Sequence, residues 1–288
     1  MARQAARSVA QEAGASPARI VAGVINYVHD TGQRGRYYAS DYSRDTIKID
    51  ARPMRIEDLR DKGASLDLDK ECFTLCRHVS TIRNFRDDEE VRRTYAGEIE
   101  KLIRELTGAS KILVSPGGVL RFGERSPEFG TRVNTRPARF VHVDYTKNAV
   151  PGLLQSQFQA AGYAPRPDQR YQGFNVWRVI SEPPQDVPLA LCDLRSTAVD
   201  DFIAADAVFD APGRPEWSFE GFVVKYNPHH RWCYFSGMTR NEVLIFRNYN
   251  STQDPPTPVP HVAFDDPSCP VGVSPRASIE TRAFAFFD

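Results

Sequence analysis

The chain has 288 residues, of which 41% are hydrophobic and 26% charged, as in an ordinary globular protein with a sizeable core. Its 37 basic and 37 acidic residues cancel, and no basic run is interleaved with aromatic residues, so nothing favours nucleic acid or an anionic membrane as a partner. No apolar stretch approaches the ~18 residues of a membrane span. We expect a small-molecule substrate, with a homo-oligomer or a pathway partner enzyme left open.

The five cysteines are an odd number, which argues against a disulfide framework and favours a reducing compartment. We therefore expect a cytoplasmic protein. Cys72 and Cys76 are four residues apart, but no second pair of ligands completes a zinc site, and half-buried thiols are the simpler interpretation. The first dozen residues, MARQAARSVAQE, have some features of a transit peptide, although we expect a frayed terminus.

Two helices are predicted in the first 165 residues. The first covers residues 87–108, because an acidic residue can cap its start, Gly108 can end it, and apolar residues recur at helical spacing: Val91, Tyr95, Ile99, Leu102, Ile103 and Leu106. The second covers VPGLLQSQFQAAGY, with Pro151 in the first turn and Gly162 at the end. Between them, KILV at 111–114 predicts a strand. The glycines and charges of residues 117–130 suggest a mobile loop.

After the second helix the chain consists of short runs rich in β-branched and aromatic residues, separated by Pro, Gly, Asn and Asp. The predicted strands are FNVWRVI (174–180), VPLALC (187–192), GFVVKY (221–226), RWCYFSG (231–237), EVLIFRNY (242–249), HVAF (261–264) and SIETRAFAFF (278–287). This pattern indicates a mainly β protein with flanking helices and a closed or sandwiched antiparallel core. We expect one domain over 1–288, with a mixed α/β portion at 1–135 packed on a β core at 136–288.

HVDYT at 142–146 is the first candidate site. Composition alone gives about one such histidine–acid pair, so the pair needs support from elsewhere in the chain. If RFVHVDY is a strand, His142 and Asp144 point to the same side and can share an ion. The arrangement to test is the facial triad of two histidines and one carboxylate, which holds Fe(II) and leaves positions open. It requires a further histidine on a later strand.

Three downstream histidines are candidates for the third ligand: His229, His230 and His261. His230 lies in NPHHRW, which is typical of a turn, whereas His261 opens a strand. After His261 come Arg276, Ser278 and Arg282, which share a strand face with Glu280.

A co-substrate such as 2-oxoglutarate needs a fixed partner for its distal carboxylate, and an arginine beside a hydroxyl suits that task. One arginine could bind the carboxylate while the other pairs with Glu280. Each residue alone could have an ordinary structural role, but the ordered set favours an iron site.

The same residues carry a family resemblance. HVDYT, FNVWR, PLALCD, YNPHHRWCYFSGM, NEVLIFRNYNS, PHVAFDDP and PRASIETRAFAF occur in order, and VINYVHDTG, the region around Asp50–Arg52 and FRDDEEVRRTYAGEIEKLIRELTGA extend the similarity towards the N-terminus. The chain resembles the hydroxylase/desaturase family of specialised metabolism, which includes the hydroxylase component of cephalosporin 7α-methoxylation, gibberellin desaturase and aspergillic acid hydroxylase.

The resemblance implies a double-stranded β-helix (jelly-roll, cupin-like) oxygenase that uses Fe(II), 2-oxoglutarate and O2. Such an enzyme hydroxylates or desaturates a small natural-product intermediate by ferryl hydrogen abstraction, releasing succinate and CO2. His142 and Asp144 would then be iron ligands with His261 as the third, and Arg276, Ser278 and Arg282 would face 2-oxoglutarate. An HRW block in the family keeps His230 as the rival third ligand.

A substrate pocket is predicted from the strand residues near the site. Asn175 and Trp177 alternate with Arg178, so either the first two line the pocket or Arg178 binds an acidic group, and Trp177 could equally well be a core residue. Tyr145 and Trp232 are aromatic candidates for the same pocket. Two rival functions remain: a non-catalytic jelly-roll partner of a tailoring enzyme, and a cupin-like metal hydrolase or isomerase that does not use 2-oxoglutarate.

Overall fold

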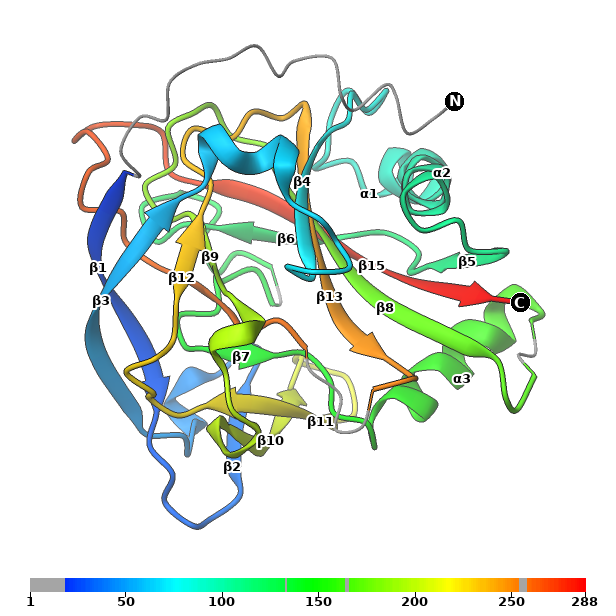
Figure 1. Cartoon of the computed structure of the whole chain (residues 1–288), viewed down its shortest axis with the longest axis horizontal. Coiled ribbons are helices and arrows are strands. Elements are labelled where there is room, and N and C mark those ends of the chain that lie inside the picture. The colour runs from blue at the N-terminus through cyan, green and yellow to red at the C-terminus, as the bar shows by residue number, and fades with distance from the viewer. Residues whose placement is uncertain (1–18, 133, 164–165, 254–257) are drawn as a thin grey trace.

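Two curved β-sheets face each other in the computed structural model, with helices on the outside of one of them (Figure 1). The structure describes residues 19–132, 134–163, 166–253 and 258–288. The first dozen residues, where we expected a frayed terminus, lie outside the described part. Among the described residues, no helix is long and apolar enough to cross a membrane.

The larger sheet has nine strands and combines segments from residues 20–58 with segments from residues 142–263. In spatial order these are β1 (Ile20–Val28), β3 (Ile49–Asp58), β12 (Trp232–Tyr234), β9 (Leu189–Cys192), β14 (His261–Ala263), β7 (His142–Val143), β11 (Trp217–Val224), β10 (Phe202–Phe209) and β2 (Gly35–Tyr38). The β3–β12 and β10–β2 pairs are parallel and the others antiparallel. Strands from the first 135 residues are therefore built into this sheet.

The smaller sheet is antiparallel and carries the longest strand near its centre. Its order is β4 (Phe73–Arg77), β13 (Glu242–Asn250), β8 (Arg170–Val179), β15 (Ala277–Phe287) and β5 (Lys111–Val114), with β6 (Val119–Phe122) also paired to β15. The expectation of a mobile loop over 117–130 is thus wrong for its first part. Leu120 and Phe122 are buried and alternate with the half-buried Val119 and Arg121 in a segment paired to β15, so the glycines flank a strand rather than interrupt one.

Both predicted helices are confirmed. The first is continuous from α1 (Asp88–Glu90) through a π-helical turn (Val91–Tyr95) to α2 (Ala96–Thr107). The Asp87 carboxylate accepts hydrogen bonds from the backbone N–H groups of Glu89 and Glu90, and Gly108 ends the helix at φ 68°. The second is α3 (Val150–Ala161). Short 3-10 turns cover Tyr42–Arg44, Arg60–Ser65, Leu194–Ser196 and Val199–Asp201.

Alternation along the strands of the smaller sheet separates two environments. On β8, Phe174 and Val176 pack with the buried face of the first helix, whereas Trp177 and Val179 pack between the sheets with residues such as Leu191 of the larger sheet. Every strand predicted between residues 174 and 287 is present, which confirms the mainly β class with flanking helices. The space between the sheets is where the candidate site lies.

Candidate metal centre and its cavity

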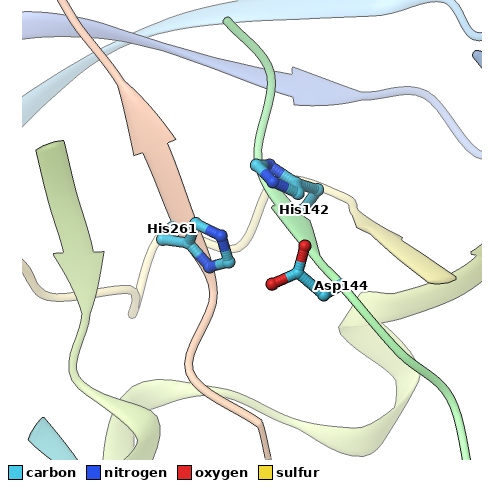
Figure 2. Close-up of side chains that lie close together, drawn as sticks. All are labelled: His142, Asp144 and His261. Atoms are coloured by element: carbon cyan, nitrogen blue, oxygen red, sulfur yellow. The ribbon is translucent and has the colours of Figure 1, made fainter. Parts of the chain in front are cut away.

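His142, Asp144 and His261 come together between the sheets (Figure 2). One potential ligand atom from each lies within 4.8 Å of those of the other two. Strands β7 and β14 are hydrogen-bonded neighbours, and His142 is directly opposite His261 in their register. Asp144 follows two residues after His142 and therefore returns to the same side of the chain. Sequence alternation thus brings together two residues of this triad, and strand pairing brings the third.

Backbone carbonyls orient both imidazole rings of the triad. His142 Nδ1 lies 3.0 Å from the carbonyl oxygen of Phe140, and His261 Nδ1 lies 3.1 Å from that of Val259. The Nε2 atoms have no hydrogen-bond partner among the described residues. Burial lowers the pKa of His142 to about 4, with His261 adding to the shift, and burial also lowers the pKa of His261. Neutral imidazoles with a fixed Nδ1–H and an open Nε2 are prepared for metal coordination.

Three side chains hold the carboxylate of Asp144. Its Oδ2 accepts hydrogen bonds from Asn175 (2.6 Å) and Asn248 (2.9 Å), and its Oδ1 accepts one from Arg282 (2.7 Å). Since each carboxylate oxygen has two lone-pair positions, Oδ2 is fully used and Oδ1 keeps one position free. This arrangement suits a carboxylate that binds a metal through a single oxygen.

The charges around Asp144 keep it ionised although it is buried. Burial alone would raise its pKa, but the Arg282 guanidinium and the two histidines of the triad hold the pKa below its usual value. Arg282 also lies 3.7 Å from Glu280, whose own pKa is raised by burial and by the charge of Asp144. Arg282 thus contacts the candidate ligand Asp144 through Nη2, while its Nε has no hydrogen-bond partner among the described residues.

Arg276 and Ser278 have the opposite property, because they are buried without partners. Arg276 is 1% exposed, and within the part of the chain that the structure describes its Nε and Nη2 atoms have no hydrogen-bond partner; the same is true of the Ser278 hydroxyl. Both residues share the inner face of the C-terminal strand segment with Glu280 and Arg282. The guanidinium lies 5.7 Å from the ring centre of Trp177, and burial lowers the pKa of Arg276 to about 9. Unpartnered donors inside a protein indicate a site for an anion.

His142, Asp144 and Arg282 line a cavity of about 360 Å3. Aromatic side chains form much of its wall, notably Tyr37, Tyr38, Tyr42, Phe129, Phe140, Phe209 and Phe219, and three further arginines line it: Arg121, Arg136 and Arg139. A mostly apolar cavity that ends at a polar group is the usual form of a small-molecule site.

The structure does not bring His230 to the triad, which corrects its place as a rival ligand. His230 Nε2 lies 3.0 Å from Asp201, its Nδ1 lies 3.1 Å from the Tyr27 hydroxyl, and Trp232 donates to that hydroxyl at 2.7 Å. Both ring nitrogens of His230 are therefore occupied. Trp232 belongs to an apolar cluster of the larger sheet, and it is Cys233, the next residue, that faces the smaller sheet. The pocket role expected for Trp232 is corrected for this reason.

The other predicted pocket residues divide between the two faces of their strands. Asn175 reaches Asp144, whereas Arg178 points the other way and donates to the carbonyl oxygens of His78 (3.0 Å) and Arg240 and to the Tyr95 hydroxyl (3.1 Å). Arg178 is thus a structural residue beneath the helix.

Trp177 and Tyr145 lie between the sheets, beside Arg276 and Arg282 respectively, and neither contributes to the cavity wall. Sequence reasoning missed Asn248. The available signal was an amide in the otherwise apolar strand EVLIFRNYN, which needs a partner when buried.

Together, a sandwich of curved sheets and a buried group of two histidines and one carboxylate beside a cavity define a non-haem metal oxygenase class. Comparisons with known proteins agree. Residues 25–286 match the family described as Oxidoreductase/YMDC permease-like domain. The hydroxylase/desaturase efuI of Hormonema carpetanum is 30% identical over 84% of this chain and 86% of that protein.

A second relative, the Fe(II)/2-oxoglutarate-dependent dioxygenase nvfI of Aspergillus novofumigatus, is 28% identical over 81% of this chain and 82% of its own length. The solved structure of the iron and alpha-ketoglutarate-dependent endoperoxidase NvfI superposes with a TM-score of 0.77 at 24% identity, covering 94% of this chain and 99% of that one. The predicted jelly-roll core is thereby confirmed.

The chain belongs to the hydroxylase/desaturase family of Fe(II)/2-oxoglutarate-dependent dioxygenases. It is an enzyme of that type, and its cofactors are iron, 2-oxoglutarate and dioxygen.

Proposed function

We propose that this enzyme hydroxylates or desaturates a small, largely apolar natural-product intermediate bound in the aromatic cavity. The observation that carries the proposal is the triad itself, with ligand atoms within 4.8 Å of one another and two of its residues on the cavity wall. A cavity of about 360 Å3 with an aromatic wall fits a compact ring-containing molecule better than a peptide or a sugar chain.

In this proposal His142, Asp144 and His261 hold the iron. The donor set fits Fe(II), because two neutral imidazoles and one carboxylate on one side leave other positions open. Iron with 2-oxoglutarate and dioxygen supplies the oxidising power that removes a hydrogen atom from the substrate, with release of succinate and CO2. The residues of this chain fix the ligands: the Phe140 and Val259 carbonyls orient the imidazoles, and Asn175, Asn248 and Arg282 orient the carboxylate.

Arg276 and Ser278 hold the distal carboxylate of 2-oxoglutarate in the same proposal. The two unpartnered guanidinium nitrogens and the unpartnered hydroxyl support this role, since a carboxylate would satisfy all three. Arg282 is assigned the orientation of Asp144, to which its Nη2 donates at 2.7 Å. The buried Trp177 ring beneath Arg276 restricts the guanidinium and keeps water from it.

The decisive experiment measures succinate formation by the purified chain with Fe(II), 2-oxoglutarate and dioxygen, against a panel of small ring-containing natural-product intermediates. We expect succinate to rise with one chemical class of the panel, accompanied by a hydroxylated or desaturated product. His261→Ala should abolish this turnover. Succinate formation that is unchanged in His261→Ala, or metal-dependent hydrolysis of a panel member without 2-oxoglutarate, would refute the proposal and favour one of the rival functions.

The partner and compartment belong to the proposal as well. A small molecule is the proposed partner, since the cavity ends at the triad. A cytoplasmic location is supported by the odd number of cysteines, of which Cys72, Cys192 and Cys233 are buried free thiols.

A further inference from the structure

The cavity has two chemically different parts, and one of them contains unpaired positive charge. Tyr37 and Phe140 pack edge to face at 5.0 Å between ring centres, and Phe209 and Phe219 stack at 5.5 Å, which makes one wall aromatic. The remaining lining carries four arginines. Whether these arginines already have acidic partners decides what the cavity can bind.

Two of the four arginines are neutralised by the protein itself. Arg282 donates to Asp144 at 2.7 Å. Arg139 pairs with Glu124 at 2.8 Å and with Asp265 at 2.6 Å. Of the acids in the lining, Asp144 and Glu124 are thus engaged, and Asp45 accepts a hydrogen bond from the backbone N–H of Tyr38 at 2.7 Å.

Arg121 and Arg136 have no acidic partner within 4 Å among the described residues. Arg121 donates through Nη1 to the backbone carbonyl and the side-chain oxygen of Asn134, which are both neutral. Arg136 stacks between aromatic rings, 4.8 Å from the centre of Tyr42 and 5.0 Å from that of Phe129. Burial lowers the pKa of Arg121, and the charge of Glu280, whose own pKa is raised, offsets that shift only in part. A further anion beside Arg121 would therefore be favourable.

Strand pairing places Arg121 at the cavity. It lies on β6 directly opposite Ser278 of β15, so it shares the inner face with Ser278 and Arg282. The strand that brings it there is the one that the flanking glycines made us predict as a loop. Arg136 comes from the segment that leads into β7, and the aromatic rings of Tyr42 and Phe129 hold it at the wall.

We infer that the substrate is a ring-containing carboxylic acid, whose apolar body packs on the aromatic wall and whose carboxylate binds Arg121 and Arg136. The inference rests on the proposed function, which it makes specific. A planar guanidinium fork suits a carboxylate, and two such groups in one cavity give the acid an advantage over a neutral molecule of the same shape. Arg121 and Arg136 are the residues that determine specificity in this scheme.

A binding experiment tests the inference without turnover. The full chain is saturated with Mn(II) and 2-oxoglutarate under argon, so that the co-substrate occupies its own positions, and the dissociation constants of 9-anthracenecarboxylate and 9-anthracenemethanol are measured by calorimetry. We expect the acid to bind at least about 10-fold more tightly than the alcohol. In Arg136→Met and Arg121→Met this preference should fall to about 2-fold, while the alcohol binds as before.

Two variants provide controls. Arg139→Met combined with Glu124→Gln removes a cavity arginine together with its acidic partner in the lining, and it should keep the preference for the acid. Arg121→Lys keeps the charge without the planar fork and should give an intermediate preference, which guards against a folding defect in Arg121→Met. Circular dichroism checks that every variant is folded.

The remaining outcomes separate this inference from the proposed function. Equal binding of acid and alcohol by the unmodified protein, or an unchanged preference in both arginine variants, overturns the inference. It is also overturned if 2-oxoglutarate abolishes acid binding and Arg121→Met weakens 2-oxoglutarate as strongly as the acid, because the arginines then belong to the co-substrate. If the proposed function alone is wrong, the protein prefers the acid equally with and without Mn(II) and 2-oxoglutarate. Succinate formation is then absent.

Discussion

Two buried clusters in this protein each combine histidine with aspartate, and they differ in whether their polar atoms have partners. In the His230 cluster (Tyr27, Asp201, His230 and Trp232), both ring nitrogens of His230 are engaged at 3.0 and 3.1 Å, and Asp201 also accepts from the backbone of Ala198 at 2.7 Å. In the triad, each histidine uses only Nδ1, and Asp144 keeps one position on Oδ1.

The difference shows how burial alone fails to identify a functional site. Both clusters are enclosed, and burial lowers the pKa of His230 just as it lowers those of His142 and His261. A cluster whose donors and acceptors are all used stabilises the fold, whereas one with aligned, unused atoms is prepared for a ligand. The comparison makes different predictions for mutations in the two places.

The largest expected effect comes from the triad. His142→Ala or His261→Ala should reduce Fe(II) binding and 2-oxoglutarate turnover to the background of metal-free protein, because two ligands do not fix the ion. Thermal unfolding should change less than in His230→Ala, since each triad imidazole makes one hydrogen bond, through Nδ1, whereas His230 makes two. Calorimetric metal titration and a melting curve test both statements. Tight Fe(II) binding by folded His261→Ala would exclude it as a ligand.

Arg276 extends the comparison to two buried arginines. Arg276→Met should raise the KM for 2-oxoglutarate about 100-fold, equivalent to about 3 kcal/mol, with metal affinity unchanged. Arg178→Met, the matched change on the neighbouring strand, should instead lower stability and leave the KM unaltered, because the partners of Arg178 are all in the protein. Steady-state kinetics at varied 2-oxoglutarate tests this. The reverse pattern would mean that unpartnered atoms do not indicate the co-substrate site.

His230→Ala should have the opposite effect to the triad variants, lowering stability and leaving metal binding unchanged. Removing this imidazole leaves Asp201 and Tyr27 each short of a partner, and the free energy of unfolding should fall by about 2 kcal/mol. Metal affinity below the melting range should remain that of the unmodified protein. Denaturant unfolding together with metal titration provides the measurement. Loss of Fe(II) binding by the folded variant would place His230 at the metal after all.

Asn175 and Asn248 connect the triad to its surroundings. Asn248→Leu or Asn175→Leu should weaken metal binding about 10-fold, because Oδ2 of Asp144 then loses one of its two donors and the carboxylate is held less firmly. Asn248→Ser, which keeps a hydroxyl donor, should recover part of the affinity. Stability is a separate readout, and a merely structural role would lower it in both replacements without changing metal affinity.

The sequence predicted the strands after residue 170 well, since β-branched and aromatic runs between turn residues strongly favour extended backbone. It missed β10, whose FIAADAVF is rich in alanine, and it missed β6 because glycines flank it. Both are held by neighbours distant in the chain: β10 by β11 and β2, and β6 by β15. Their local preference is weak, and long-range pairing decides their conformation.

For the site, the sequence predicted residues that alternation places on one face of a single strand. It did not predict residues that other strands bring to the space between the sheets. His142 and Asp144 follow from alternation, and the preference for His261 over His230 followed from the order of strands. Arg121 reaches the site through the register of β6 with β15, and Asn248 reaches it at the point between Arg247 and Tyr249 where the pairing of β13 with β8 shifts. The opposite orientations of Asn175 and Arg178 were open in the sequence, since alternation gives two faces without saying which is inner.

The smallest expected effect concerns Asp45, a partly exposed carboxylate of the cavity lining that accepts one hydrogen bond, from the backbone N–H of Tyr38. Burial raises its pKa to about 6 from 3.8, against the effect of the Tyr38 N–H. The folded state therefore holds this proton more tightly, so stability should fall as pH rises from about 4 to about 6. Asp45→Asn should remove that slope and stabilise the protein at pH 7 by about 1 kcal/mol, after allowance for solvent screening.

Denaturant unfolding at several pH values measures the effect. An unchanged slope in Asp45→Asn would show that Asp45 does not cause the slope and that water solvates this carboxylate. A carboxylate with too few hydrogen-bond partners would then lower the stability of the protein only where it is as buried as Asp201 and Asp144.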